Sequence, residues 1–278
     1  KLLSIIGTRP QFIKAAAIAR ASRKLKINHF IVDTGQHYSE NMSSSFIQEL
    51  GLNKIDYCLN IGEKSSVSQL SEIMKKLEPL IPKIKPDYVI VYGDTNSTLA
   101  ASVVCSRLKI KIAHVEAGLR SKNNEMQEEV NRILTDNISS ILFTATKEAT
   151  QNLLHEKFDK KKIYQVGDVM FDSVKFFKKK IKKIQSDNYA LLTFHRAENV
   201  DERGRLELLV QSFLRLSEKI QIILPIHPRT KKKLIKFNLF SKLKKKIKII
   251  DPQPYLELLK LIYNSQYVIT DSGGIQKE

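Results

Sequence analysis

The sequence feature that most constrains the fold is a short apolar run that ends in glycine and an acidic residue and leads directly into a helix. Residues 88–91 are apolar and rich in β-branched side chains, as is typical of a strand buried in a parallel sheet. The run stops at Gly93-Asp94, and Thr95 is placed to cap a helix that continues to Ser106. Units of this kind, repeated along the chain, predict an α/β fold with parallel sheets.

The same pattern places acidic residues at one edge of the predicted sheet. Asp94 follows one strand, Glu116 follows the strand expected at 110–114, and Glu128 and Glu129 begin the next helix. Ligands of open parallel sheets bind at the carboxyl ends of the strands. Any one of these carboxylates could instead be a turn residue or a partner of a helix dipole. Together they indicate an active site, because grouped carboxylates shift each other's pKa and suit proton abstraction and return.

The alternation of strands and helices continues through both halves of the chain. Further strands are expected at 2–6, 29–32, 141–143, 163–166, 189–193, 221–225, 247–250 and 267–270, with helices at 67–80 and 203–216 and a lysine-rich helix reaching about 184. We place the boundary between an N-terminal domain of residues 1–170 and a C-terminal domain of residues 171–278. The chain stops in the first turn of the helix that should cover strand 267–270, so we expect the second domain to be incomplete.

Several loops that follow strands carry groups suited to phosphate. Arg9 and Lys14 flank the helix start after Gly7-Thr8, where free N–H groups favour an anion. The G-T-R-P pattern differs from G-x-G-x-x-G, so a dinucleotide is not indicated. His195 and His227 each follow a strand, and Ser272-Gly273-Gly274 begins a helix. A lone histidine is usually structural, but these loops together indicate a nucleotide diphosphate.

The composition bears on partners and location. The 278 residues carry a net charge of +18, with lysines concentrated in 175–183, 231–236 and 242–248. Lysine outnumbers arginine there and no aromatic stacking pattern accompanies it, so we expect a solvated face and no nucleic acid. The sequence has no run of 18 apolar residues, so we expect no membrane insertion. No secretion signal is visible, and two cysteines without metal or framework spacing predict no metal site and a reducing cytoplasm.

Assembled along the whole chain, these motifs resemble those of the non-hydrolysing UDP-N-acetylglucosamine 2-epimerase family. They are G-T-R-P at 7–10, T-G-Q-H-Y at 34–38, G-D-T-N-S-T-L-A at 93–100, H-V-E-A-G-L-R at 114–120, E-E-V-N-R at 128–132, H-R-A-E-N at 195–199 and D-S-G-G-I-Q-K-E at 271–278. The resemblance implies two Rossmann-like domains of the glycosyltransferase-B type, with a UDP-sugar in the cleft between them. It also implies a homodimer, and an enzyme that supplies surface-polysaccharide biosynthesis.

The resemblance implies inversion of C2 of the sugar by anti elimination of UDP and re-addition to a glycal, with no cofactor. By position, Asp94, Glu116 and Glu128 match the family's acid/base carboxylates, and His195 matches the histidine that assists the leaving diphosphate. Positions that match the family's nucleotide-binding residues are Arg9, Lys14, Gln253, Ser272, Gly273, Gly274 and Glu278. Gln36 and His37 fall where some bacterial members bind a second, activating UDP-sugar.

The chain also departs from the family pattern. Gln11 stands where many relatives have Glu, Asn137 where many have His, and Leu258 where some have Phe near the uracil. P-Q-F-I-K, H-R-A-E-N and G-I-Q-K-E also resemble relatives that act as 2-epimerases on UDP-2,3-diacetamido-2,3-dideoxyglucuronate, and spacing does not choose between the substrates. A UDP-sugar transferase of the same two-domain type, or a non-catalytic UDP-sugar binder, is a different class, against which the carboxylate cluster favours epimerisation.

Overall fold

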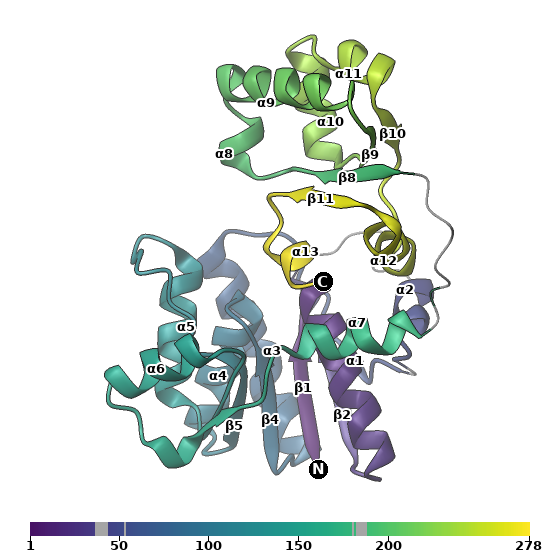
Figure 1. Ribbon diagram of the computed structural model, residues 1–278. Helices are drawn as coiled ribbons and strands as arrows, with labels where there is room; N and C mark the ends of the chain where they lie inside the picture. Colours follow the sequence, from purple (N-terminus) through teal and green to yellow (C-terminus); the bar gives the residue numbers. More distant parts are fainter. Residues whose placement is uncertain (37–43, 53, 180, 182–187) are drawn as a thin grey trace. The chain divides into compact units, whose positions relative to one another are not determined.

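The computed structural model describes residues 1–36, 44–52, 54–179, 181 and 188–278, which form two compact units, Lys1–Ser173 and Val174–Glu278. Each unit has its own parallel sheet with helices packed on it, which confirms the predicted α/β class (Figure 1). Each predicted strand is present within three residues of its expected bounds. The helix expected to reach about 184 ends at Lys178, and residues 180 and 182–187 are outside the described part.

The first unit is built on a seven-stranded sheet. Its strands are β1 (Leu2–Ile6), β2 (His29–Asp33), β3 (Tyr57–Cys58), β4 (Tyr88–Tyr92), β5 (Lys111–Ala117), β6 (Ile141–Thr144) and β7 (Ile163–Gln165). They lie in the order β3-β2-β1-β4-β5-β6-β7, and every neighbouring pair is parallel. The turns after β1, β4 and β5 therefore meet at one edge of the sheet, as the carboxylate positions led us to expect.

Helices cover this sheet and provide its core. They are α1 (Arg9–Lys24), α2 (Ser44–Glu49), α3 (Ser66–Ile84), α4 (Asn96–Arg107), α5 (Gln127–Ile138), α6 (Lys147–His155) and the short 3₁₀ helix η1 (Lys160–Lys162). α7 (Val169–Lys178) begins in this unit and continues past Ser173 into the second. In α3, Ile73, Leu77 and Ile81 recur every four residues and are fully buried in the same cluster as β4. Each contributes about 1.5–3 kcal/mol of burial energy, so this stripe holds α3 on the sheet.

The second unit has a four-stranded parallel sheet in the order β10-β9-β8-β11. Its strands are β8 (Tyr189–Thr193), β9 (Gln221–Pro225), β10 (Lys248–Ile250) and β11 (Tyr267–Thr270). Its helices are α8 (Ala197–Val200), α9 (Arg203–Leu216), α10 (Pro228–Lys236), α11 (Phe240–Lys246), α12 (Tyr255–Asn264) and α13 (Gly273–Lys277). Leu206, Val210 and Phe213 of α9 pack with Leu192 and Phe194 in its main core.

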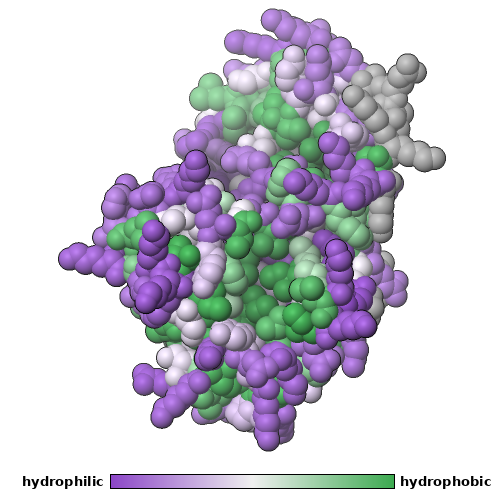
Figure 2. All heavy atoms as spheres, turned by 60° about the horizontal axis from the view of Figure 1, so that its bottom comes forward, coloured by the Kyte–Doolittle hydropathy of each residue, from purple (hydrophilic) through white to green (hydrophobic). Residues whose placement is uncertain are grey.

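Hydrophilic and apolar side chains share the face of the molecule that Figure 2 shows. Figure 2 shows hydrophilic side chains over much of the visible face, with apolar areas between them, in keeping with the 27% of charged residues. The lysines of α10 and α11 are mostly exposed, including Lys231, Lys232, Lys244 and Lys245. Of the described helices, none is both long enough and apolar enough to cross a membrane.

Candidate active site

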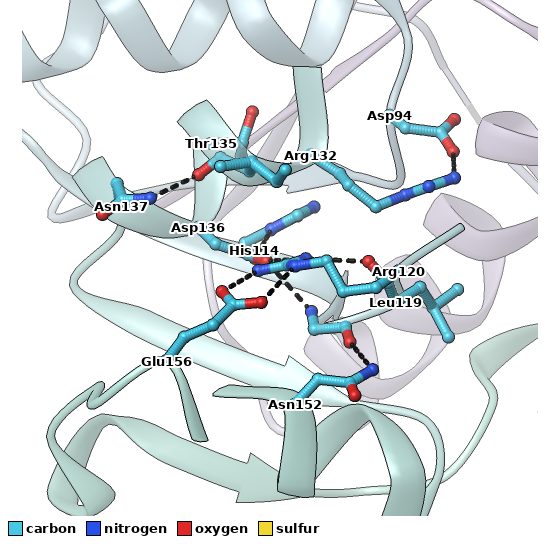
Figure 3. A network of polar contacts seen from close by, with 12 residues as sticks. Asp94, His114, Leu119, Arg120, Arg132, Thr135, Asp136, Asn137, Asn152 and Glu156 are labelled. Atoms are coloured by element: carbon cyan, nitrogen blue, oxygen red, sulfur yellow. Dashed lines mark hydrogen bonds and ion pairs between the residues drawn. The ribbon is translucent and has the colours of Figure 1, made fainter. Parts of the chain in front are cut away.

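The turn between β4 and α4 presents Asp94 at the carboxyl edge of the sheet. Gly93 takes a left-handed conformation at φ +63°, which directs the chain out of β4. Thr95 then caps α4 by accepting the N–H of Thr98, as predicted. The side chain of Asp94 is 31% exposed and forms an ion pair with Arg132 of α5 (Figure 3). Asp94 is therefore held in place while remaining open to a ligand.

Glu116 lies inside β5, at an irregularity of the strand. The register against β6 shifts between Val115 and Ala117, and Glu116 itself has φ +74°. A left-handed glutamate is uncommon, and such bulges re-aim side chains near functional sites. The carboxylate pairs with the ammonium group of Lys14 from α1, and the two side chains are only 11% and 7% exposed. The bulge thus directs Glu116 toward a residue whose sequence position also suggested ligand binding.

Gly93 is the junction between Asp94 and Glu116. Its N–H donates to the Val115 carbonyl at 2.9 Å, which ties the β4 turn to β5. A Cβ atom at position 93 would lie 3.6 Å from Oε2 of Glu116 and 3.8 Å from Nζ of Lys14. Asp94, Glu116 and Lys14 therefore gather around one turn.

The structure separates the neighbouring glutamates of α5. Glu129 is 1% exposed, accepts the N–H groups of Ser121 and Lys122, and pairs with Arg132. Burial alone would raise the pKa of Glu129, but these hydrogen bonds outweigh it and lower the pKa. Glu128, in contrast, is exposed. Glu129 therefore holds the 121–122 loop, and Glu128 is available to a ligand.

Asp94 and Glu128 share a polar cavity of about 500 Å³. It is lined by Gln36, Glu63, Lys64, Ser66, Gln69, Asp94, Thr95, Asn96, Gln127, Glu128 and Asn131. Hydroxyl, amide and carboxylate groups of this kind suit a ligand rich in hydroxyl groups. Glu116 is not among the described residues of the lining, and its connection to Asp94 runs through Gly93.

Gln36, the position that resembles an activating-ligand site, also has an internal partner. Its side-chain oxygen accepts the backbone N–H of Ser97 at 2.9 Å and the Ser97 hydroxyl at 2.6 Å, at the start of α4. Its backbone carbonyl accepts the amide of Gln69 at 3.1 Å. Gln36 therefore forms part of the cavity wall, while His37 lies outside the described residues.

Gln11 is a site residue to which the sequence analysis gave no role. Its side-chain oxygen accepts the N–H groups of Gly7 and Thr8 at 2.8 and 3.2 Å. Its side-chain nitrogen donates to the Tyr92 carbonyl and to the hydroxyls of Thr95 and Thr98, at 2.7–3.0 Å. Gln11 thus joins the turn before α1 to the Asp94 turn. The spacing of Thr8 and Gln11 is that of a capping box, the signal that could have revealed it.

In the second unit, Asp271 organises the loop that carries His195. Its carboxylate accepts the N–H groups of His195 and Arg196 and the amide of Asn199, at 2.9–3.1 Å. Burial alone would raise the pKa of Asp271, but these donors and the nearby His195 lower it. Nδ1 of His195 lies 3.5 Å from the same carboxylate. The backbone of the His195 loop is therefore fixed by a charged side chain.

The two histidines predicted at this edge lie against each other. The rings of His195 and His227 stack with centroids 5.2 Å apart. Nδ1 of His227 accepts the N–H of Arg229 at 3.2 Å and caps α10. Burial, followed by the charges of His195 and Arg229, lowers the pKa of His227. His227 therefore has a structural bond on one nitrogen and the His195 ring beside it.

The Ser272-Gly273-Gly274 turn follows β11, next to β8. The Ser272 hydroxyl caps α13, and its N–H donates to the Thr270 hydroxyl at 2.9 Å. Glu278 closes the same short helix. Gln253 follows β10, which β9 and β8 separate from β11, and its amide donates to the Asp251 carbonyl at 2.7 Å. Gln253 is thus at the far side of this sheet from Ser272.

Comparisons with known proteins agree on one family. Residues 19–278 match the family described as UDP-N-acetylglucosamine 2-epimerase. A UDP-N-acetylglucosamine 2-epimerase of Methanocaldococcus jannaschii is 47% identical over 100% of this chain and 80% of its own length. The UDP-2,3-diacetamido-2,3-dideoxy-D-glucuronate 2-epimerase of Pseudomonas aeruginosa is 44% identical with the same coverage. The crystal structure of the M. jannaschii enzyme with UDP-GlcNAc and UDP superposes with a TM-score of 0.88, at 48% identity over 99% of this chain and 80% of that one.

Proposed function

Because the chain belongs to the UDP-N-acetylglucosamine 2-epimerase family, we propose that it is an isomerase that interconverts UDP-N-acetylglucosamine and UDP-N-acetylmannosamine. Its two parallel α/β units are Rossmann-like, of the glycosyltransferase-B type seen in the structural relatives. The observation that carries the proposal is the gathering of carboxylates at one sheet edge, where Asp94 and Glu128 share a cavity and Glu116 adjoins the same turn.

Inversion at C2 requires a proton to leave one face of the sugar and another to arrive at the opposite face. In the proposed reaction a carboxylate takes the C2 proton, the C–H electron pair forms a C1–C2 double bond, and the C1–O bond breaks with UDP taking its electrons. UDP then returns to C1 while a proton is delivered to the other face of C2. Asp94, Glu116 and Glu128 are the proposed acid/base groups, a role suited to positioned carboxylates.

The leaving diphosphate is assigned to groups that supply hydrogen bonds and positive charge. We assign His195 to the departing phosphate, since donors placed at developing negative charge lower the barrier. Arg9, Lys14, His227, Gln253, Ser272, Gly273, Gly274 and Glu278 are proposed to bind the nucleotide. The loop that Asp271 organises around His195 supports this assignment. Gln36 and His37 are proposed to contact a second UDP-sugar.

Proton exchange with solvent tests the mechanism. UDP-N-acetylglucosamine incubated with the enzyme in D2O, with no acceptor present, should yield UDP-N-acetylmannosamine that carries deuterium at C2, as read by NMR. A carboxyl group that has lost its proton to solvent exchange has only deuterium to return. Epimerisation that retains the original C2 hydrogen would refute the proposal, and a sugar transferase would form no product in this assay.

Substitutions test the assigned roles. Asp94→Asn and Glu116→Gln keep the side-chain shape but remove proton transfer, so turnover should fall about 10²–10⁴-fold. His195→Asn should also lower turnover, while UDP affinity changes far less in the carboxylate variants. Glu125→Gln is the matched control, because Glu125 is an exposed carboxylate outside the cavity lining. Wild-type turnover in Asp94→Asn would remove Asp94 from the mechanism.

The P. aeruginosa relative favours one second candidate substrate, a UDP-2,3-diacetamido-2,3-dideoxyglucuronate. The same NMR assay with that sugar distinguishes the two, since the preferred substrate gives the higher kcat/KM.

We also propose a cytoplasmic homodimer. Free Cys58 and Cys105 suit a reducing compartment, and sedimentation at micromolar concentration tests the dimer.

A further inference from the structure

His114 of β5 is a buried residue in a network of hydrogen bonds and ion pairs, and the proposed mechanism does not use it. Its side chain is 0% exposed, yet both ring nitrogens have partners. Nδ1 lies 2.7 Å from the Asp136 carboxylate, and Nε2 lies 2.8 Å from the Gly93 carbonyl oxygen. Figure 3 shows Asp136 next to both His114 and Arg120. The imidazole therefore connects α5 to the turn that carries Asp94.

The partners of His114 determine where its hydrogens lie. A carbonyl oxygen only accepts, so Nε2 must donate to Gly93. Asp136 also accepts the Gly118 N–H at 3.1 Å and Arg120 at 2.8 Å. Burial alone would raise the pKa of Asp136, but the charges of and hydrogen bonds from His114 and Arg120 lower it. The carboxylate is ionised and surrounded by donors, so Nδ1 donates as well.

The rest of the network fixes Asp136. Arg120 pairs with Asp136 and also makes two 2.7 Å hydrogen bonds to Glu156. Because Gly118 and Arg120 hold Asp136 independently of His114, Asp136 orients the imidazole rather than following it. The ring in turn holds the Gly93 carbonyl in one direction.

The position of Gly93 links the orientation of the His114 ring to the positions of Asp94 and Glu116. Its N–H is bound to Val115 and its carbonyl to His114, so both sides of the residue are anchored to β5. Asp94 is the next residue, and a Cβ at position 93 would lie 3.6 Å from Glu116. A rotation of the Gly93 carbonyl would therefore move Asp94 relative to Glu116.

We propose that His114 is a positioning residue, which sets the relative placement of Asp94 and Glu116 through its hydrogen bond to the Gly93 carbonyl. This inference rests on the proposed function, because it assigns His114 to the same reaction. The alternative is a purely structural role, in which His114 only neutralises the buried Asp136. Both roles involve Nδ1, but only the first depends on Nε2.

Two variants separate the nitrogens. An asparagine side chain ends near the position of Nδ1 and keeps a donor for Asp136, whereas a glutamine side chain reaches the position of Nε2 and keeps a donor for Gly93. We expect His114→Asn to lower kcat about 100-fold, the scale of a 1 Å misplacement. His114→Gln should lower kcat less than about 10-fold, and KM should change less than about threefold in both, because neither nitrogen is assigned to substrate.

Thermal unfolding supplies a readout that a structural role would not reproduce. His114→Asn keeps the bond to Asp136, so it should be at least as stable as His114→Gln while being the less active variant. Activity and stability that fall in the same order, or equal kcat in the two variants, would overturn the inference. If wild-type protein itself gives no turnover, the proposed function fails instead, so the two failures are distinguishable.

Asp136→Asn provides a second test that does not require His114 to be replaced. Its side-chain oxygen can still accept from Nδ1, and the bond between Nε2 and Gly93 is unchanged. This variant should lose stability yet retain kcat within about 10-fold. A 100-fold loss of kcat in a folded Asp136→Asn enzyme that keeps the hydrogen on Nε2 of His114 would overturn the inference, because the bond to Gly93 would then not control turnover. NMR of ¹⁵N-histidine should also show hydrogen on Nε2 of His114, the donor to the Gly93 carbonyl, and a bare Nε2 would refute the inference.

Discussion

His29 provides a test of how burial controls the pH dependence of stability in the first unit. It begins β2, where Nε2 lies 2.8 Å from the Ser4 hydroxyl and Nδ1 is buried without a hydrogen-bond partner among the described residues. The ring lines a small cavity with Arg23, Lys54 and Asp56. Burial lowers the pKa of His29 from 6.5 to about 4, despite the opposing attraction of Asp56. The folded protein therefore keeps this ring neutral under conditions that protonate it in the unfolded chain.

The sign of the effect follows from proton binding. Between pH 6.5 and 4 the unfolded chain binds a proton at His29 and the folded chain does not, so the free energy of unfolding falls as the pH falls. The loss begins near pH 6.5 and is complete below pH 4. Over the whole window it amounts to about 3 kcal/mol, from 1.36 kcal/mol per pKa unit. Between pH 7.5 and 5.0, where most carboxylates remain ionised, it is about 2 kcal/mol.

The perturbation is His29→Gln, which keeps a polar side chain but removes the titration. The free energy of unfolding of wild-type protein should fall between pH 7.5 and 5.0 by about 2 kcal/mol more than that of the variant. Urea unfolding followed by circular dichroism measures this, since the chain has no tryptophan for fluorescence. Hydrogen exchange over β1 and β2 assigns the change to the first unit. His155→Gln is the control, because His155 is exposed on α6.

Equal pH dependence in wild-type protein and His29→Gln would refute the reasoning, because the folded and unfolded states would then bind the same number of protons at His29. If His155→Gln reduced the pH dependence of the unfolding free energy as much as His29→Gln does, the effect would not be specific to a buried histidine.

Two further predictions concern the site and its support. Glu128→Gln should lower turnover about 10²–10⁴-fold without changing the melting temperature. Glu129→Gln should cost about 1–3 kcal/mol of stability, because the buried side chain would lose its charge beside Arg132 and turn an amide N–H toward the N–H donors of Ser121 and Lys122. If Glu129→Gln is the inactive but stable variant, the assignment is reversed. Gly118→Ala should destabilise the protein strongly, because φ is +79° and the new Cβ would lie 2.3 Å from the Ala149 carbonyl. Gly62→Ala shares the positive φ, but its Cβ would meet no atom of the described part of the chain within 4 Å, so it should lose only about 1–2 kcal/mol. Equal losses in the two variants would contradict the close-contact argument.

Most of the fold could be predicted because a strand buried on both faces is a continuous apolar run. Tyr88–Tyr92 shows this directly, since four of its five residues are buried. β3 could not be found this way. It has only two residues, Tyr57 and Cys58, and both are exposed at the sheet edge, so no apolar run marks it.

The candidate site was less accessible to sequence reasoning, because it depends on side-chain direction. Glu128 and Glu129 both favour the start of a helix, and only the position of the 121–122 loop shows which one is buried. Glu116 could be placed after a strand, but the bulge that turns it toward Lys14 is set by pairing with β6. His114 occupied a short β-branched run, and its partner Asp136 is 22 residues away in the chain.

Gln11 couples the turn before α1 to the turn after β4. Its oxygen serves two N–H groups of one loop, and its nitrogen serves three oxygens of the other. A glutamate at this position could keep the first set, but it would place a second carboxylate oxygen against the Tyr92 carbonyl. Gln11→Glu in this chain should therefore disturb the turn after β4. Position 11 and the turn after β4 therefore act as one unit, and a change at either calls for a matching change at the other.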